Sequence, residues 1–375
     1  MTKKILITTE SLVMGGVETS LLDLLKILSK YDTSIDLYVT KKGELIEEAE
    51  KITNVNVIPV KIPNNKLFFR IQKNLLCKSL FKKYKKLNNK KYDVAIAYYG
   101  INNYSDMYAA ACNCDKKIIW VHNNFESSYK MSKIKLIIKL RNLIMKRKFK
   151  YFDNIIAVSN SAKEGFLRVF DGFEKKVQVI NNTFDINKLK KADEKCEFEM
   201  IGKNKLIYVG RLVSTKCVDK LILECQKVMN DISDTYLYIL GDGTELEYLK
   251  NIVKELKLED KIFFFGNQVN PYKYMKQADI VVTASILEAN SINSLESLAM
   301  KKYFVSADNE GAKDIYYGIN QGNDNNGIIC SQDQIHKYIK KYILQEKKVK
   351  PNFDMKKYND NVEMQLVNLF GIKKK

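Results

Sequence analysis

Residues 205–230, KLIYVGRLVSTKCVDKLILECQKVMN, decide the fold class of this chain. The apolar run in KLIYVG predicts a buried strand that ends at Gly210, and the apolar positions of 217–230 recur at helical spacing. Four further runs of the same kind follow, each before an amphipathic segment: YLYILGDG, KIFFFG, DIVVTAS and YFVSAD. Their helices are expected at 244–257, 271–277, 291–300 and 311–316. Strands that alternate with helices in this way predict βαβ units and a parallel sheet.

The N-terminal half has the same rhythm. KILITTE (4–10) is a strand, LVMGG is a glycine turn, and VETSLLDLLKILSKY (17–31) has helical spacing. Further apolar runs follow as far as VQVI (177–180), and the alternation then pauses over the polar stretch 186–204. We therefore expect two doubly wound Rossmann-like α/β domains, residues 1–186 and 187–350, which suits a chain of 375 residues. Because ligands of such sheets bind beyond the carboxyl ends of the strands, the two domains are expected to face each other across a ligand cleft.

The charge of +19 is unevenly distributed. Residues 1–180 hold 33 Lys and Arg against 17 Asp and Glu, and two segments without any acid, 61–91 and 130–150, hold 11 and 9 basic residues. Such segments fit a local anionic partner, and basic amphipathic helices can lie on an anionic membrane surface. The alternative is core-packed helices with lysine-rich outer faces. Nucleic-acid binding is not expected, because no stacking aromatics and no known module accompany the charge.

Other global features place the chain in the cytoplasm. No signal peptide and no run of about 18 apolar residues is visible. The seven cysteines lack paired metal spacing, which favours free thiols in a reducing compartment.

Two cations follow the strand that ends at Gly210. Arg211 and Lys216 stand in the loop before the helix at 217–230. Two fixed cations beside a helix N-terminus can hold a diphosphate, with Arg giving planar contacts and Lys a mobile charge. The alternative is a pair of solvated loop cations.

Two glutamates eight residues apart follow DIVVTAS. Glu288 lies after the strand and Glu296 in the next helix, which Ser291 and Asn293 can open with their side chains. Carboxylates at these places suit sugar and ribose hydroxyls, which are hydrogen-bond donors. The alternative is one acid at a helix start and another on the surface.

The N-terminal half offers fewer candidates. Gly15 and Gly16 occupy the first strand-to-helix loop, where glycine lets a ligand approach the backbone, although no dinucleotide-binding pattern is present. His122 ends the strand IIWVH, where it can bind a hydroxyl or serve a structural role. Asn182 lies at a strand end near the domain boundary.

Taken in order, the motifs resemble the large retaining glycosyltransferase family 4, which has the GT-B fold. The resemblance runs from MGGVE through VH, VSNSAKEGF, VINNTFD, VGRLVSTK, LGDG and ADIVVTAS to the two glutamates. It implies that 1–186 binds the acceptor, that 187–350 binds the nucleotide sugar, and that a helix in 351–375 crosses back to the N-terminal domain. The chain departs from the family where Ala289, Asn290 and Ser291 follow the first glutamate and where Cys217 replaces a glycine.

The resemblance also implies roles for individual residues. Arg211 and Lys216 would bind the donor diphosphate, Glu288 the donor sugar and Glu296 the ribose, with His122 near the transferred sugar. The residues expected to be catalytic are His122, Glu288, Arg211 and Lys216. The residues expected to bind the donor are Gly15, Gly16, Asn182, Gly210, Arg211, Lys216, Glu288, Asn290, Ser291, Ile292 and Glu296.

These implications define the expected function. The chain would be a retaining, metal-independent hexosyltransferase that moves a sugar from a UDP-sugar or other nucleotide-diphosphate sugar to a glycan or lipid-linked acceptor. No metal and no cofactor besides this co-substrate is expected. The setting would be capsule or other cell-surface polysaccharide synthesis, with a teichoic-acid-type polymer as an alternative, at the inner face of the plasma membrane. The competing expectation is a catalytically inactive GT-B protein that binds a glycan or a partner.

Overall fold

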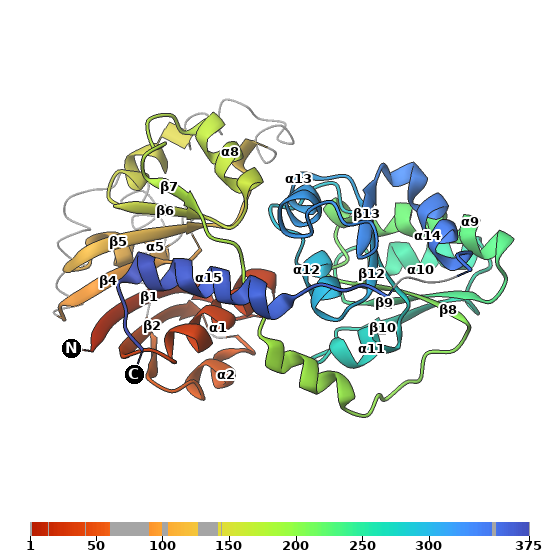
Figure 1. Cartoon of the computed structure of the whole chain (residues 1–375), viewed down its shortest axis with the longest axis horizontal. Helices are drawn as coiled ribbons and strands as arrows, with labels where there is room; N and C mark the ends of the chain where they lie inside the picture. The colour runs from red at the N-terminus through yellow and green to blue at the C-terminus, as the bar shows by residue number, and fades with distance from the viewer. Residues whose placement is uncertain are drawn as a thin grey trace. The chain divides into compact units, whose positions relative to one another are not determined.

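The computed structural model describes residues 2–13, 15–41, 43–60, 90–99, 104–126, 142–143, 145–346 and 350–374. They form two compact units, drawn in Figure 1. The first unit comprises Met1–Thr183 and Asn359–Lys375, and the second comprises Phe184–Tyr358. The sequence analysis predicted the boundary between the two domains at residue 186. The division falls slightly earlier because Phe184 and the 3₁₀ helix η1 (Ile186–Asp193) pack into the core of the second unit.

The N-terminal unit is built on a seven-stranded sheet in the order β3-β2-β1-β4-β5-β6-β7, with every pair parallel. The strands are β1 (Lys3–Ser11), β2 (Thr33–Lys41), β3 (Val55–Pro59), β4 (Tyr92–Ala97), β5 (Cys114–Val121), β6 (Asn154–Ala157) and β7 (Val177–Val179). Strand β1 is fully buried over Ile5–Ile7, as expected for a strand covered on both faces.

Helices connect the strands of this unit. Helix α1 (Gly16–Leu28) begins one residue before the helix expected at 17–31, and further helices are α2 (Ile46–Glu50), α5 (Tyr104–Ala111) and α8 (Asn160–Val169). Helix α8 is capped by Ser159, whose hydroxyl accepts a hydrogen bond of 3.0 Å from the Ala162 backbone N–H.

The last helix, α15 (Met355–Phe370), begins in the second unit and joins the first from Asn359 onward. The Tyr31 hydroxyl donates to Glu363 at 2.7 Å, and the Lys116 amine donates to the Leu369 carbonyl at 2.7 Å. Phe370 lies parallel to Trp120, with ring centroids 6.3 Å apart. The end of the chain is thus part of the N-terminal core.

The C-terminal unit holds a six-stranded parallel sheet in the order β10-β9-β8-β11-β12-β13. Its strands are β8 (Asn204–Val209), β9 (Thr235–Leu240), β10 (Ile262–Gly266), β11 (Ile280–Thr283), β12 (Tyr303–Ala307) and β13 (Gly327–Cys330). Its longer helices are α9 (Val218–Asp231), α10 (Leu246–Glu255), α11 (Tyr272–Gln277), α12 (Ile292–Ala299) and α14 (Ile335–Ile343). The helix expected at 311–316 is instead α13 (Glu310–Lys313), followed by the π-helical turn η3 (Asp314–Ile319).

Two hydrophobic clusters cover the two faces of this sheet. One joins α9, α10 and α14 to the strands, and the other joins η1, α11, α12 and η3. The prediction of two doubly wound Rossmann-like α/β domains is therefore confirmed.

Each sheet contains a point where the strand order reverses. In the first sheet β1 lies beside β4, and in the second β8 lies beside β11. The loops that leave two such strands go to opposite faces of the sheet, and the space between them is the usual ligand position. The loops after β8 and β11 carry the candidate diphosphate and sugar residues of the sequence analysis.

Candidate active site

The β8 loop and the β11 loop meet at the reversal point of the C-terminal sheet. Gly210 and Arg211 follow β8 directly, and the 3₁₀ turn η2 (Ser214–Lys216) leads into α9. The β11 loop runs past Glu288 to α12. The Ile286 backbone N–H donates to the Thr215 carbonyl at 3.2 Å, so the two loops are joined through their main chains.

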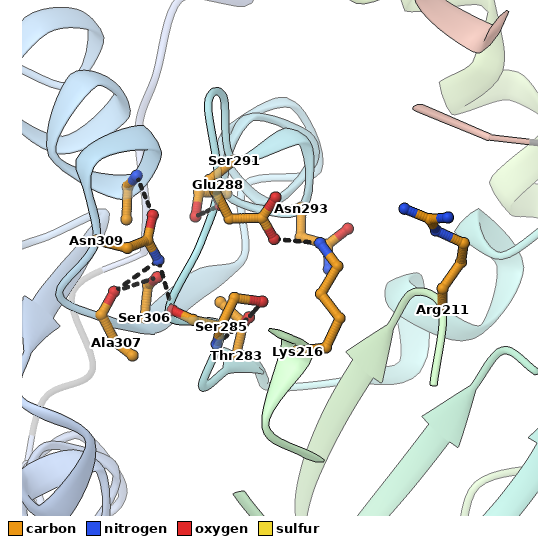
Figure 2. Close-up of polar contacts among 12 residues, drawn as sticks. Arg211, Lys216, Thr283, Ser285, Glu288, Ser291, Asn293, Ser306, Ala307 and Asn309 are labelled. Atoms are coloured by element: carbon orange, nitrogen blue, oxygen red, sulfur yellow. Dashed lines mark hydrogen bonds and ion pairs between the residues drawn. The ribbon is translucent and has the colours of Figure 1, made fainter. Parts of the chain in front are cut away.

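Lys216 and Glu288 form an ion pair between these loops. The Lys216 amine donates to Oε1 of Glu288, and each side chain is only 19% exposed (Figure 2). Within the described ranges, the exposed Arg211 guanidinium makes no hydrogen bond and no ion pair. One cation at this edge is therefore engaged by a carboxylate, while the other is available to an anion.

A buried tyrosine supports the Arg211 backbone. The Tyr208 hydroxyl donates to the Arg211 carbonyl at 3.1 Å. Burial raises the pKa of Tyr208, the charge of Glu288 raises it further, and Arg211 opposes the shift. The phenol thus remains a neutral donor. Gly210 has φ of +153°, and a Cβ there would stand 3.0 Å from the Tyr208 hydroxyl oxygen, so glycine suits this turn.

The LGDG motif packs directly beneath the same loop. Gly241 has φ of +142°, and a Cβ at this residue would lie 1.9 Å from the Gly210 carbonyl oxygen. The Leu212 backbone N–H donates to the Asp242 carbonyl at 2.8 Å. The Gly243 backbone N–H donates to the Asp242 carboxylate at 2.7 Å within the same motif. LGDG therefore positions the loop that carries Arg211.

The segment around Glu288 is held from the other side by the start of α13. The Gly311 backbone N–H donates to the Glu288 carbonyl at 3.0 Å, and a Cβ on Gly311 would approach Glu288 and Asn290 to 2.8 Å. The buried Asn309 amide donates to the Ser285 carbonyl at 2.8 Å and to the Ala307 carbonyl at 3.2 Å (Figure 2). These contacts fix the backbone from which the Glu288 side chain extends.

Glu296 lies in a different environment from Glu288. It is buried on α12, and its Oε1 accepts a hydrogen bond of 2.9 Å from the Tyr272 hydroxyl. Tyr272 in turn meets Phe184 edge to face, with ring centroids 5.7 Å apart. The interpretation of Glu296 as a surface acid is therefore wrong, and its carboxylate has a fixed orientation.

The expected cap of α12 is not formed. Ser291 precedes the helix, but its hydroxyl bonds with that of Ser294 at 2.8 Å and caps no backbone N–H. The Asn293 amide donates to the Val209 carbonyl, so that it ties α12 to the end of β8. Of the other expected donor-binding residues, Asn290 is buried and Ile292 is partly exposed at the helix start.

The glycine pair of the N-terminal unit stands at the start of α1. Gly15 is the residue before the helix, with an extended φ of −169°, and Gly16 is its first residue. A Cβ on Gly15 would lie 2.6 Å from the Glu18 carboxylate, a flexible group. Gly15 is thus not required by backbone conformation.

His122 follows β5 and lies against Tyr98 of the neighbouring β4 end, with ring centroids 4.7 Å apart. Burial lowers the pKa of His122 to about 3, although a hydrogen bond with the Tyr98 backbone opposes the shift. Its Nε2 atom is buried and has no hydrogen-bond partner in the described part of the chain. His122 is therefore a buried, neutral imidazole.

The remaining candidates divide between described and undescribed parts. Asn182 is buried beyond β7, at the end of the N-terminal unit. The basic segment 61–91 lies outside the described residues except for Lys90 and Lys91. In the second basic segment, Lys148 is buried in an ion pair with Asp106 and Lys146 pairs with Asp171, so part of its charge is already neutralised.

Two further findings concern metal binding and membrane-spanning helices. Among the described residues, no three His, Cys, Asp or Glu side chains are grouped so that they could hold a metal ion. No helix within the described ranges has the length and apolar character needed to cross a membrane.

Sequence reasoning missed four residues that shape the site: Tyr208, Tyr272, Asn309 and Gly311. Asn309 and Gly311 follow the strand YFVSAD, and this strand-end position was the available signal. The two tyrosines had no such signal, because a tyrosine in an apolar run is usually a core residue and its hydroxyl partner is distant in sequence.

Both halves of the chain match known protein families. Residues 14–188 match the family described as Glycosyltransferase Family 4, and residues 191–361 match Glycosyl transferases group 1. An uncharacterized glycosyltransferase of Methanocaldococcus jannaschii is 29% identical over 201 residues, which cover 52% of this chain and only 49% of that protein.

A second relative matches over most of both chains. It is the N-acetylgalactosamine-N,N'-diacetylbacillosaminyl-diphospho-undecaprenol 4-alpha-N-acetylgalactosaminyltransferase of Campylobacter jejuni, 27% identical over 86% of this chain and 84% of that protein. The crystal structure of Anabaena HepE in complex with UDP-glucose superimposes with a TM-score of 0.74 at 17% identity, covering 97% of this chain and 99% of that one. The chain belongs to the family 4 type of glycosyltransferases with the GT-B fold.

Proposed function

We propose that this glycosyltransferase is retaining and metal-independent, and that it moves a sugar from a UDP-sugar to a glycan or lipid-linked acceptor in cell-surface polysaccharide synthesis. The observation that carries the proposal is the grouping of Arg211, Lys216 and Glu288 at the β8–β11 reversal point. Two cations suit the diphosphate of a nucleotide sugar, and the carboxylate suits the hydroxyls of its sugar.

The cations act on the leaving group. As the bond between the sugar C1 and the diphosphate oxygen breaks, negative charge grows on the diphosphate, and pre-placed cations stabilise it. Arg211 offers a planar set of donors and Lys216 a mobile ammonium. The loss of one such contact is expected to lower kcat by about 10²- to 10³-fold.

The stereochemical course follows from attack on the same face. The acceptor oxygen forms its bond to C1 on the side from which the diphosphate leaves, and its proton passes to a phosphate oxygen of the departing group. The α configuration of the donor is then kept. His122, neutral because burial holds its pKa near 3, is suited to binding a sugar hydroxyl and not to donating a proton as an imidazolium.

Metal independence rests on the same cations. A divalent ion in a glycosyltransferase site neutralises the diphosphate and polarises the leaving group. Arg211 and Lys216 supply this positive charge from fixed loops. Transfer should therefore proceed at an unchanged rate in the presence of a chelator.

The donor and acceptor classes are drawn from the relatives. HepE was crystallised with UDP-glucose, and the Campylobacter relative is named for transfer of N-acetylgalactosamine to a diphospho-undecaprenol-linked sugar. UDP-linked hexoses and N-acetylhexosamines are thus the donors to try, with a polyprenyl-diphosphate-linked glycan as acceptor.

A lipid-linked acceptor agrees with peripheral attachment to the inner face of the plasma membrane. Near residues 142–151, Leu143 is 56% exposed and Tyr151 is 44% exposed, beside the exposed cations Arg147 and Lys150. Apolar and basic side chains together favour binding to anionic lipid. Flotation with vesicles that contain anionic lipid should carry the wild type, and Leu143→Ser/Tyr151→Ser should reduce this binding.

The activity test is incubation with UDP-sugars and a polyprenyl-diphosphate-linked acceptor, with and without chelator. The proposal predicts transfer that survives the chelator, a product whose anomeric proton couples as an α-glycoside, and loss of transfer in Arg211→Ala/Lys216→Ala. An inverted product or a trapped glycosyl-enzyme would contradict the mechanism. Nucleotide-sugar binding without transfer to any acceptor would favour an inactive binding protein.

A further inference from the structure

The Lys216–Glu288 pair joins two residues that the proposed function assigns to different parts of the donor. Lys216 is assigned to the diphosphate and Glu288 to the sugar, yet here each is the other's partner. Both side chains are largely shielded from water, so solvent screens this pair less than an exposed one. A diphosphate that takes Lys216 must therefore compete with Glu288.

The backbones on both sides of the pair are fixed. Glu288 is held through its carbonyl by Gly311, and the Ile286 backbone is bonded to Thr215 beside Lys216. The Lys216 backbone N–H closes the turn η2 by donating to the Val213 carbonyl at 2.9 Å. Only the side chains can change partners, and a lysine side chain has the rotatable bonds to do so.

Arg211 completes the arrangement. Its exposed guanidinium, which lies outside the ion pair in Figure 2, is the cation that an arriving diphosphate can meet without breaking any contact in the described part of the chain. Lys216 becomes available only when its pair with Glu288 opens. The two cations therefore differ in the order in which they can engage a ligand.

We propose that donor binding exchanges the partners of this pair: the diphosphate takes Lys216, and the released Glu288 carboxylate turns to accept hydrogen bonds from the donor sugar. Glu288 is thus a positioning residue for Lys216 in the free enzyme and a sugar-binding residue in the complex. This inference rests on the proposed function, since it uses the same ligand at the same residues.

The exchange has an unusual consequence for affinity. Glu288→Gln removes the competitor for Lys216, so UDP, which has no sugar, should bind about 3- to 10-fold tighter than to the wild type. In Glu288→Gln the intact UDP-sugar also gains affinity through the released Lys216, but it loses the contact between its sugar and the Glu288 carboxylate. The ratio of UDP-sugar affinity to UDP affinity should therefore be lower in Glu288→Gln than in the wild type. A residue that merely maintained the site's structure would not shift these two ligands in different proportions.

Calorimetry of UDP binding to four proteins tests the exchange: wild type, Glu288→Gln, Lys216→Gln and the double variant. The gain from Glu288→Gln should vanish in the Lys216→Gln background, because the competition requires both partners. Glu247→Gln is the matched control. It removes an exposed carboxylate of the same C-terminal unit, which pairs with Lys250 on the same helix α10. Its affinity for UDP should stay within about 2-fold of the wild type.

The possible outcomes separate the exchange from the proposed function. Weaker UDP binding by Glu288→Gln would overturn the exchange. An equal gain in the Lys216→Gln background, or in the control Glu247→Gln, would overturn it as well. Absence of UDP and pyrophosphate binding to the wild type would also overturn it. The predicted pattern without sugar transfer to any acceptor would leave the exchange standing while the proposed function fails.

Discussion

Replacement of Gly241 by alanine should destabilise the C-terminal unit and weaken nucleotide binding at the same time. The added Cβ would lie 1.9 Å from the Gly210 carbonyl oxygen, where real Cβ contacts stay beyond 3.0 Å, and Gly241 has φ of +142°. The backbone would have to move by about 1 Å, which costs roughly 1–3 kcal/mol by overpacking. The unfavourable dihedral angle adds about 1–3 kcal/mol.

Two other glycines separate these contributions. Gly322 has φ of +66°, and a Cβ added there would have no atom within 4 Å. Gly322→Ala should therefore lose stability only through the unfavourable dihedral angle, by about 1 kcal/mol. Gly243→Ala would place its Cβ 2.2 Å from the Leu212 carbonyl oxygen without a positive φ, so it carries the steric cost alone. The loss of stability is expected to be smallest for Gly322→Ala, larger for Gly243→Ala and largest for Gly241→Ala.

The assay is urea unfolding followed by circular dichroism, together with UDP calorimetry under native conditions. Gly241→Ala should lower the free energy of unfolding by roughly 2–6 kcal/mol and weaken UDP binding, because the displaced Gly210 carbonyl precedes Arg211. Gly322→Ala should leave UDP affinity unchanged. A Gly241→Ala protein as stable as Gly322→Ala, with wild-type affinity, would refute the argument that LGDG supports the Arg211 loop.

Three further predictions concern single side chains. Tyr272→Phe removes the hydroxyl that donates to the buried Glu296 carboxylate, so it should cost about 1.5–3 kcal/mol of stability and weaken UDP binding. Tyr248→Phe on the exposed face of α10 should cost nothing, and equal urea midpoints for the two variants would contradict this. Cys217 has φ of +49°, so Cys217→Gly should be about 1 kcal/mol more stable than Cys217→Ala in the same unfolding assay, and the reverse order would argue against strain there. His122 has a pKa near 3 when folded and 6.5 in its unperturbed state, so the unfolded chain binds the extra proton between these values and stability falls as pH drops below 6.5. Between pH 7 and 4.5 the wild type should therefore lose about 2 kcal/mol more than His122→Gln, measured by Trp120 fluorescence, and identical losses would show that His122 is not buried as a neutral ring.

The sequence was sufficient to predict the strands and the two loop cations, because these depend on local patterns. Apolar runs followed by glycine turns indicate parallel strands, and functional side chains tend to stand just beyond them. Arg211, Lys216 and Glu288 were expected on this basis, and all three stand beyond strand ends in the structure. Periodicity could not reveal that β8 and β11 are neighbours, since strand order depends on long-range packing.

The contacts between distant residues were beyond such reasoning. The partner of Lys216 is Glu288, and the partner of Glu296 is Tyr272. Neither pair shares a helix face or a hairpin, so no spacing rule connects them. The cap expected at Ser291 failed for a related reason. Its hydroxyl had another acceptor in Ser294, and the choice between two nearby partners depends on backbone angles that the sequence does not specify.

The central claim is that Arg211 and Lys216 form the diphosphate site of a nucleotide-sugar donor. Calorimetry with UDP, GDP and ADP in the absence of metal, on the wild type and on Arg211→Ala/Lys216→Ala, tests it most directly. We predict that UDP binds the wild type in preference to the other two, and that the double variant loses at least about 100-fold in affinity, as expected for the loss of two charged contacts. Absence of nucleotide binding to the wild type, or UDP binding that is unchanged in the double variant, would contradict the claim.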